Sequence, residues 1–273
     1  FCYAPMAGIV LAFKNYRFDL GIFGSEWAGL KHFRKFVTSP EFWMTIKNTL
    51  VITSLKLVVC FPAPIILALL INEVKNKHFK KMAQTISYMP YFLSTVVVCG
   101  FITTILSNDG LINHVISSLG LEKVQFLMEP GWFRPVYVIS EIWQQCGWGS
   151  IIYLAALAGV DSQLYEAAAI DGAGKWKQLI HVSIPGIAPV ISIQLLLTVG
   201  KLLTVGYEKI LLLYTGATYS TADVISTYVY RRGLMEANYS YGSAVSIFQA
   251  VMALILVVLA NKAARKVGQT SLW

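Results

Sequence analysis

The sequence predicts an all-α membrane protein with six transmembrane helices, and three observations support this prediction. Of the 273 residues, 56% are hydrophobic and only 13% are charged, whereas a soluble domain of this length has about 25% charged residues. Apolar runs recur along the chain, at the length of roughly 20 residues that a helix needs to cross a bilayer. The net charge of +8 is explained by basic loops between these runs. It therefore indicates membrane topology and gives nucleic-acid binding no support.

The first apolar segment, residues 1–13, is too short to cross a bilayer by itself. We expect it to be the outer part of a first helix that begins before Phe1. The five longer runs lie at residues 46–71, 83–106, 132–160, 187–214 and 242–260. Pro62, Pro64 and Pro90 fall within two of these runs, where they are expected to kink or locally open the helix.

The Lys and Arg residues of the loops predict the orientation of the spans. Three basic segments, residues 72–81, 161–185 and 261–266, alternate so that they lie on one side of the membrane. The positive-inside rule makes this side, and with it the C-terminus, cytoplasmic. Residues 14–45 are also basic but fall on the outer side. Their amphipathic pattern, WAGLKHFRKFV, predicts a helix that lies on the outer surface of the membrane, against lipid.

Residues 161–185 form the longest helix-compatible stretch that is not mostly apolar. Asp161 is placed to cap a short helix over SQLYEAAAI, and Gly172 to supply a turn in the left-handed region. A second short helix, KWKQLIHVSI, is expected to stop before Pro185. Small residues would let another protein surface approach closely, and two acidic residues offer charge to a basic partner. From these features alone, a docking site and an ordinary helical loop remain equal alternatives.

At this stretch the sequence resembles a known family. The residues that carry the resemblance are Glu166-Ala167-Ala168, then Gly172, then Val182-Ser183-Ile184-Pro185, with Asp171 and Ala173 completing a DGA triplet. This pattern is similar to the EAA signature of permease subunits of bacterial ABC importers, and the DGA triplet to its form in sugar permeases. Residues 27–50 resemble the outer segment of the same permeases. The C-terminal half is similar to permeases for oligosaccharides and polysaccharides, including uronic-acid polymers such as alginate or pectin fragments.

The resemblance implies a maltose-permease-like, type I importer fold in the bacterial cytoplasmic (inner) membrane. Residues 161–185 would be the coupling helices between helices 4 and 5, which dock in a cleft of a cytoplasmic ATPase. The implied coupling residues are Glu166, Ala167, Ala168, Asp171, Gly172, Ala173 and Pro185. The implied partners are a second, non-identical permease, two ATPase subunits and an extracytoplasmic solute-binding protein. ATP and Mg would bind to the ATPases, so this chain would hold no cofactor and would not be an enzyme.

Polar residues inside a span usually face the bundle interior or a water-filled path. In the fourth span, helical spacing places Glu141, Gln144, Gln145 and Trp148 on one face, with Trp143 and Tyr153 nearby. In the fifth span it does the same for Gln194, Thr198, Lys201 and Glu208. Amides, carboxylates and aromatic rings suit a sugar, and a lysine would suit a carboxylated one. The alternative to a substrate-binding role is hydrogen bonding between packed helices. For Lys201, Glu208 and Lys209, ion pairing with one another is a further alternative. Lys56 is given no role.

Together with the resemblance, these features predict an importer subunit for an oligo- or polysaccharide, with a uronic-acid-containing one such as alginate as a candidate. A neutral sugar or glycerol phosphate is the alternative substrate. An ion-coupled secondary transporter is a further alternative, but it predicts inverted repeats that the sequence does not show. A membrane-embedded enzyme would need paired catalytic groups, and the four cysteines and four histidines lack metal-ligand spacing.

Overall fold

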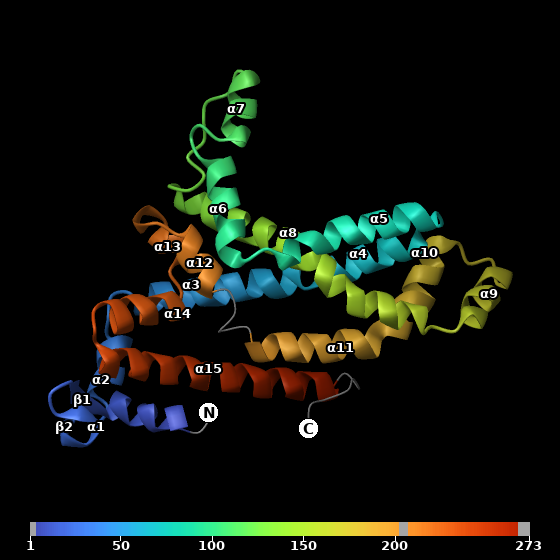
Figure 1. The fold of residues 1–273 in the computed structure, drawn as a ribbon. Coiled ribbons are helices and arrows are strands. Elements are labelled where there is room, and N and C mark those ends of the chain that lie inside the picture. Colours follow the sequence, from blue (N-terminus) through green and yellow to red (C-terminus); the bar gives the residue numbers. More distant parts are fainter. Residues whose placement is uncertain (1–3, 202–206, 267–273) are drawn as a thin grey trace. The chain divides into compact units, whose positions relative to one another are not determined.

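The computed structural model describes residues 4–201 and 207–266, and side chains for residues 8–200, 207–259, 261 and 262. By its contacts, the chain divides into two compact units, each assembled from separate stretches of sequence. The first unit comprises Phe1–Ser54, Thr103–Pro135 and Lys201–Leu256, and the second comprises Leu55–Ile102, Val136–Gly200 and Val257–Trp273. The described chain is mostly helical, as predicted (Figure 1).

The first unit holds the N-terminal elements and most of those near the C-terminus. Its 3₁₀ helices are Ala4–Phe13 and Gly216–Thr218, and a π-helical turn spans Tyr230–Met235. Its other elements are β1 (Lys14–Arg17), α1 (Gly21–Gly24), β2 (Ser25–Trp27), α2 (Lys31–Val37), α3 (Phe42–Leu55), α7 (Leu111–Ser118), α12 (Tyr207–Leu213), α13 (Tyr219–Ala222), α14 (Ile225–Val229) and α15 (Tyr239–Lys266), whose residues from Val257 on belong to the second unit.

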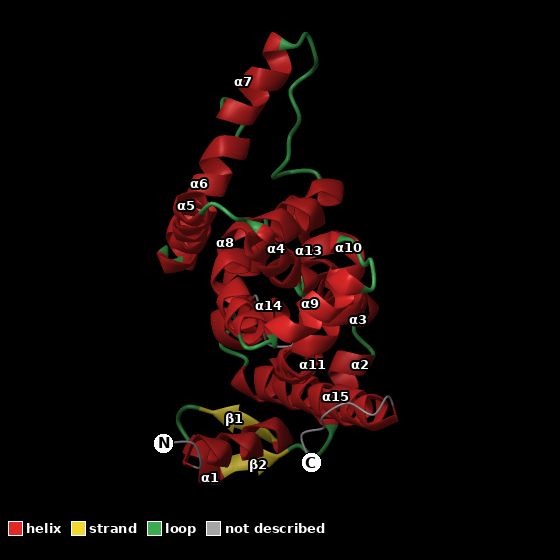
Figure 2. Ribbon diagram, turned by 90° about the vertical axis from the view of Figure 1, so that its right-hand side faces the viewer, coloured by secondary structure: helices red, strands yellow, loops and turns green. Residues whose placement is uncertain are grey.

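Two short strands are the exception to the predicted all-helical fold. Strands β1 and β2 pair in antiparallel register, with Lys14 opposite Trp27 (Figure 2). They are too short to show the alternation over four to eight residues by which a strand is recognised in a sequence. The predicted amphipathic helix is present as α2, which buries His32 and Phe36. Burial lowers the pKa of His32, whose Nε2 lies 3.1 Å from the carbonyl oxygen of Lys14.

An aromatic core and a polar network hold the first unit together. The core consists of Phe36, Phe42, Ile225, Tyr228, Tyr241 and Val245. In the network, the Asn48 side-chain amide donates to the carbonyl oxygens of Tyr219, Ser220 and Asp223. Arg134 donates to Asn48 Oδ1 at 3.0 Å. One amide thus connects α3, α8 and the α13 region, and such a satisfied buried network specifies how the helices meet.

The second unit holds the elements that carry the candidate site. Its π-helical turns are Lys56–Cys60 and Leu179–Ser183, and its 3₁₀ helix is Met89–Phe92. Its α-helices are α4 (Pro62–Glu73), α5 (Lys77–Tyr88), α6 (Thr95–Leu106), α8 (Pro130–Ala158), α9 (Ser162–Ile170), α10 (Lys175–Gln178) and α11 (Ile184–Lys201); α6 and α8 each have one end in the first unit. Its core consists of Ala68, Leu69, Tyr153, Leu157 and Ile187 and joins α4, α8 and α11.

Within the described residues, four helical segments are long and apolar enough to cross a membrane. These are Phe42–Glu73, Thr95–Ser118, Lys175–Gly200 and Tyr239–Leu259. They overlap four of the runs predicted at residues 46–71, 83–106, 187–214 and 242–260. The run at 132–160 is a continuous helix, α8, and residues Ala4–Phe13 form a 3₁₀ helix. The total of six crossings stays a prediction.

The run at residues 83–106 does not form a single helix, and the opening expected at Pro90 is confirmed. Helix α5 ends at Tyr88, a 3₁₀ turn contains Pro90, and Leu93 has an extended backbone. Helix α6 begins at Thr95 after Ser94, whose Oγ accepts a hydrogen bond from the Val97 amide. The break follows Pro90, which cannot donate a backbone hydrogen bond.

Prolines elsewhere are accommodated without ending a helix. The expectation that the helix after residue 174 stops before Pro185 is wrong, because the helical path continues through Pro185 into α11. A π-helical turn, Leu179–Ser183, immediately precedes this point, and another, Lys56–Cys60, precedes Pro62. Proline loses one backbone bond and its ring crowds the carbonyl four residues earlier. A wider turn moves that carbonyl away from the ring.

The contact between α8 and α5 depends on Gly147. A Cβ atom at this position would overlap the carbonyl group of Ser87. We expect Gly147→Ala to destabilise the protein by about 1–3 kcal/mol, because a backbone group cannot move aside as a flexible side chain can. Thermal unfolding of the purified protein in detergent, followed by tryptophan fluorescence, would measure the change. Gly131→Ala in the same helix, where nothing lies within 4 Å, is the control. Equal melting temperatures for the two variants would contradict the prediction.

Candidate functional site

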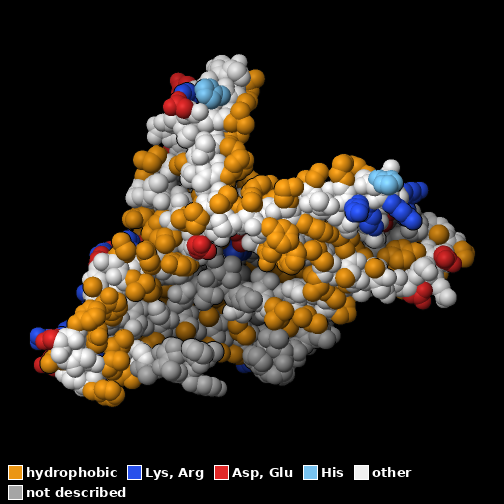
Figure 3. Space-filling model, viewed as in Figure 1, with side chains coloured by type: hydrophobic (Ala, Val, Ile, Leu, Met, Phe, Trp, Pro, Cys, Tyr) orange, Lys and Arg blue, Asp and Glu red, His pale blue; other side chains and the backbone are white. Residues whose placement is uncertain are grey.

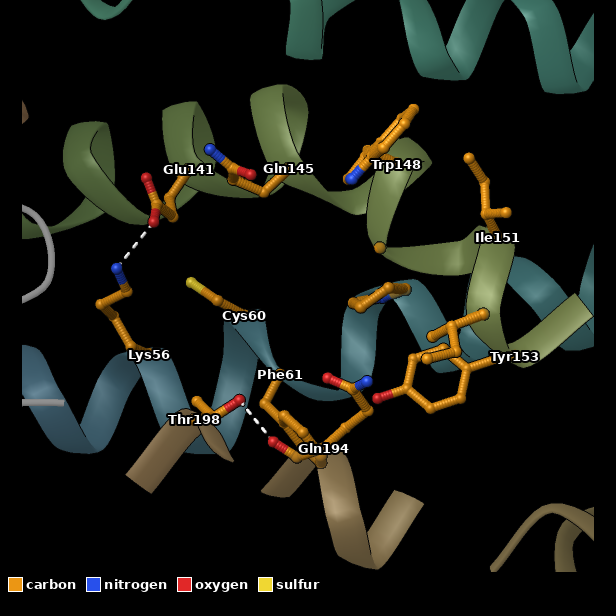
Figure 4. A pocket seen from close by; sticks show the side chains of 13 residues that line it. Lys56, Cys60, Phe61, Glu141, Gln145, Trp148, Ile151, Tyr153, Gln194 and Thr198 are labelled. Atoms are coloured by element: carbon orange, nitrogen blue, oxygen red, sulfur yellow. Dashed lines mark hydrogen bonds and ion pairs between the residues drawn. The ribbon is translucent and has the colours of Figure 1, made fainter. Parts of the chain in front are cut away.

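A cavity of about 620 Å³ lies in the second unit, between three helical segments. One segment is the π-helical turn with the start of α4, and the others are α8 and α11 (Figure 4). The lining residues are Lys56, Cys60, Phe61, Pro64, Glu141, Gln145, Trp148, Gly149, Ile151, Ile152, Tyr153, Gln194 and Thr198. A mostly apolar wall with a few polar groups is typical of small-molecule sites.

Six of the ten residues predicted for a substrate path line this cavity. They are Glu141, Gln145, Trp148, Tyr153, Gln194 and Thr198. The side-chain amide of Gln194 and the hydroxyl of Tyr153 point into the space from different helices (Figure 4). Thr198 Oγ1 donates to the backbone carbonyl of Gln194 at 2.7 Å. The cavity therefore combines groups that were predicted separately on the fourth and fifth spans.

The other four predicted residues are not among those that line the cavity. Gln144 is buried, and its Nε2 donates to the carbonyl oxygen of Leu93 at 3.2 Å. Trp143 stacks on Phe101, with 6.0 Å between ring centroids. Glu208 is exposed on α12. The side chain of Lys201 lies outside the described residues.

Helical spacing alone could not predict that Gln144 is absent from the cavity lining while Glu141, Gln145 and Trp148 belong to it. At about 100° per residue, Gln144, Glu141, Gln145 and Trp148 all fall within one broad stripe. Gln144 lies at the edge of that stripe, and its side-chain amide reaches the carbonyl oxygen of Leu93, in the interruption between α5 and α6. Packing against α6 thus decides which of the four residues faces the cavity.

Lys56 is the functional candidate that the sequence analysis missed. Its Nζ lies 2.7 Å from Glu141 Oε1, and the two side chains are only 9% and 11% exposed. The ammonium also lies over the ring of Tyr137, 5.9 Å from its centroid. The two charged residues are 85 positions apart, so no local pattern relates them. The available signal was a lysine and a glutamate of opposite charge within two apolar runs, where each needs a partner.

One aromatic ring of the wall is itself held in place by stacking. The ring of Trp148 stacks on Tyr91 with 4.6 Å between centroids and an interplanar angle of 5°. This contact fixes the indole at the cavity wall. Amide groups both donate and accept hydrogen bonds, and aromatic rings offer flat apolar faces. Together they match the hydroxyls and the ring faces of a saccharide.

The predicted coupling segment forms two short helices with a turn between them. Asp161 caps α9, since its Oδ1 accepts a hydrogen bond of 2.9 Å from the Gln163 amide. Gly172 has φ = +74°, the left-handed conformation predicted for it. Both features confirm the local expectations. Helix α10 follows, and Gln178 Nε2 donates back to the carbonyl oxygen of Ala173 at 3.1 Å.

Most of the predicted coupling residues are accessible in this chain. Glu166, Ala167, Asp171, Gly172 and Pro185 are exposed, while Ala168 and Ala173 are half-buried. Large apolar side chains are exposed beside them: Ile170 is 87% exposed and Trp176 is 78% exposed. Figure 3 shows hydrophobic and acidic side chains together at the end of the second unit that carries α9. Exposed apolar residues next to charged ones are typical of a protein interaction site.

The chain as a whole is similar to known transport proteins. Residues 61–269 match the family model described as "Binding-protein-dependent transport system inner membrane component". The polygalacturonan/rhamnogalacturonan transport system permease protein YteP of Bacillus subtilis (strain 168) is 47% identical, over 100% of this chain and 85% of that protein. Protein LplB of the same organism is 42% identical, over 100% of this chain and 86% of that protein.

A solved structure agrees with these sequence matches. The crystal structure of a bacterial alginate ABC transporter, in complex with a periplasmic protein bound to an alginate pentasaccharide, contains a similar chain. The TM-score is 0.92 and the identity 44%, over 100% of this chain and 91% of that one. A second structure, of a bacterial ABC transporter involved in the import of the acidic polysaccharide alginate, gives a TM-score of 0.91 at 45% identity, over 97% of this chain and 90% of that one.

Helices long enough to cross a membrane and a cavity with a few polar groups in an apolar wall are features of a membrane transport subunit. The chain belongs to the family of inner membrane components of binding-protein-dependent transport systems. It is therefore a multi-pass ABC transporter permease of the inner membrane, and a transport subunit rather than an enzyme. Among the described residues, no group of three or more His, Cys, Asp or Glu could hold a metal ion.

The buried ion pair yields a stability prediction. Lys56→Met removes one member of this buried ion pair, which should cost about 3–5 kcal/mol. The double variant Lys56→Met with Glu141→Leu should recover most of that loss, because it removes both charges of the pair. Melting temperatures in detergent would compare these variants with Lys47→Met, an exposed lysine on α3. A Lys56→Met protein that melts like the wild type would show that the Lys56–Glu141 contact does not contribute to stability.

Proposed function

We propose that this chain is the transmembrane subunit of an ATP-driven importer that passes a uronic-acid-containing oligo- or polysaccharide across the bacterial inner membrane. The similarity over the whole of this chain to a chain of a bacterial alginate ABC transporter, at a TM-score of 0.92, carries this proposal most strongly. The relative YteP, named for polygalacturonan and rhamnogalacturonan, supports the same class of substrate. Alginate and polygalacturonan are both acidic, so a carboxylated sugar is the common element.

The proposal includes a topology of six crossings with a cytoplasmic C-terminus. Residues 161–185 then lie in the cytoplasm between the fourth and fifth helices, and residues 14–45 lie on the outer surface. The subunit would work with a second permease, two ATPases that hold ATP and Mg, and an extracytoplasmic binding protein. The family description, binding-protein-dependent transport, supports the last of these partners.

The segment of α9 and α10 is the proposed coupling element. Glu166 and Asp171 would pair with basic groups of the ATPase, and the small side chains at Ala167, Ala168 and Gly172 would allow close approach. The exposed Ile170 and Trp176 would be buried in the same interface, which stabilises it through removal of apolar area from water. Movement of the ATPase would then be transmitted to α11, because α10 runs into α11 without a break in the helical path.

The cavity is the proposed sugar site on the pathway. Gln145, Gln194 and Tyr153 would exchange hydrogen bonds with sugar hydroxyls, and Trp148 would stack on a sugar ring. A neutral sugar remains a second candidate, because the charges of Lys56 and Glu141 cancel. For Gln144 the hydrogen bond to Leu93 supports a role in holding α8 against the start of α6. Trp143 and Glu208 are proposed to contact the substrate only outside this cavity.

Co-purification tests the proposed assembly. Extraction of the chain from native membranes in mild detergent should recover an ATPase with a phosphate-binding loop and a second permease, identified by mass spectrometry. The reconstituted complex, supplied with its binding protein, should take up uronic-acid oligosaccharides when ATP is present inside the liposomes. Uptake of no saccharide by the intact complex would reject the proposed function.

Substitution at Gly172 tests the coupling role. Gly172→Pro cannot adopt φ = +74°, because proline fixes φ near −65°, so the turn between α9 and α10 should be lost. We expect ATP hydrolysis to continue while uptake falls at least about tenfold, an apparent barrier increase of about 1.4 kcal/mol. Gly174→Ala is the matched control, since its φ is −67° and nothing lies within 4 Å. Normal uptake by the Gly172→Pro complex would reject the coupling role.

A further inference from the structure

Lys56 and Glu141 are the charged residues among the described side chains that line the cavity. They come from different helices and meet at one end of it (Figure 4). A buried ion pair contributes little to stability compared with a well-packed apolar pair of similar volume. Stability by itself therefore does not account for an ion pair in the wall of a cavity. The remaining walls are amides, hydroxyls and aromatic rings, which would bind a neutral sugar equally well.

A carboxylated sugar places an additional requirement on this cavity. A carboxylate that leaves water needs hydrogen-bond donors or a cation, since an unpaired buried charge is costly. Among the described lining residues, only Lys56 supplies a cation. An ammonium group has three donors, and the bond to Glu141 Oε1 uses one of them. The same ammonium is therefore able to receive a second carboxylate from the cavity side.

Glu141 would limit how tightly that second carboxylate binds. Two carboxylates that share one cation repel each other, and the repulsion is stronger where water is excluded. In the empty cavity, Glu141 compensates the charge of Lys56 and holds the ammonium in position. With the sugar bound, Glu141 opposes tight binding and so favours release. Passage through a membrane protein requires binding that is favourable enough to admit the solute and weak enough to let it leave.

We propose that Lys56 recognises the carboxylate of an acidic sugar and that Glu141 is its competing counter-ion, so that this pair sets the preference for acidic over neutral substrates. The proposal rests on the proposed function and assigns the charge selectivity to one atom, Lys56 Nζ. It explains how a cavity whose described charges cancel can still take an anionic substrate. The lysine shares its donors between the glutamate and the sugar, and it never leaves Glu141 unpaired.

The test measures equilibrium binding of trigalacturonate and of its methyl ester to the purified transporter complex in nanodiscs, without binding protein. The two probes have the same length and ring hydroxyls and differ in charge. The wild type should bind the acid more tightly than the ester. Glu141→Gln should tighten acid binding about tenfold and leave ester binding unchanged, because it removes the competing charge. Lys56→Gln together with Glu141→Gln should abolish the preference for the acid.

The double variant removes both charges of the pair, so it carries the test if the Glu141→Gln variant is too unstable to purify. Lys47→Gln removes an exposed lysine from the same long helix and should keep the wild-type preference. A double variant that retains this preference would overturn the proposal. So would a wild-type complex that imports the acid but binds acid and ester equally, or binds neither. Failure of the complex to import any saccharide would instead count against the proposed function.

Discussion

Polar groups inside an apolar bundle must find their partners within the protein, because hydrocarbon offers none. The contact between Lys56 Nζ and Glu141 Oε1, at 2.7 Å, satisfies this requirement for the two charges of the cavity. It also ties the π-helical turn that precedes α4 to the middle of α8. In the first unit the same requirement is met by Asn48, whose amide connects α3 with the α13 region. The positions of the helices in each unit therefore follow from where their polar groups meet.

Helix α8 is the element on which the second unit depends. One face carries Glu141, Gln145 and Trp148 to the cavity, and another brings Gly147 against the backbone of Ser87. The absence of a side chain at Gly147 lets α5 approach closely, which is the usual role of small residues between membrane helices. Trp148 follows directly in the chain and stacks on Tyr91. Tight packing on one side of α8 thus holds the polar residues on its other side at fixed positions.

The proposed coupling segment differs from the cavity in how it is stabilised. Its helices are short, and their ends rely on local hydrogen bonds such as the Asp161 cap and the return of Gln178 to Ala173. Its exposed apolar residues, above all Ile170 and Trp176, pack against little of this chain. Such a segment keeps its shape locally while presenting an apolar surface outwards. This arrangement suits an element that receives force from another subunit, because the path from α10 into α11 is continuous.

The sequence by itself predicted those features that depend on composition or on residues close together in the chain. Composition and the apolar runs defined a helical membrane protein, Asp161 and Gly172 defined the helix cap and the turn, and the residues from Glu166 to Pro185 indicated the permease family. Tertiary structure decided the rest. It paired Lys56 with Glu141, turned Gln144 towards Leu93, and carried the helix through Pro185 by a π-helical turn. These outcomes depend on contacts between groups that are far apart in sequence, or on the space that a π-helical turn leaves for a proline ring. Helical periodicity fixes only the face of a helix on which a residue lies, and the neighbouring helix decides what that residue meets.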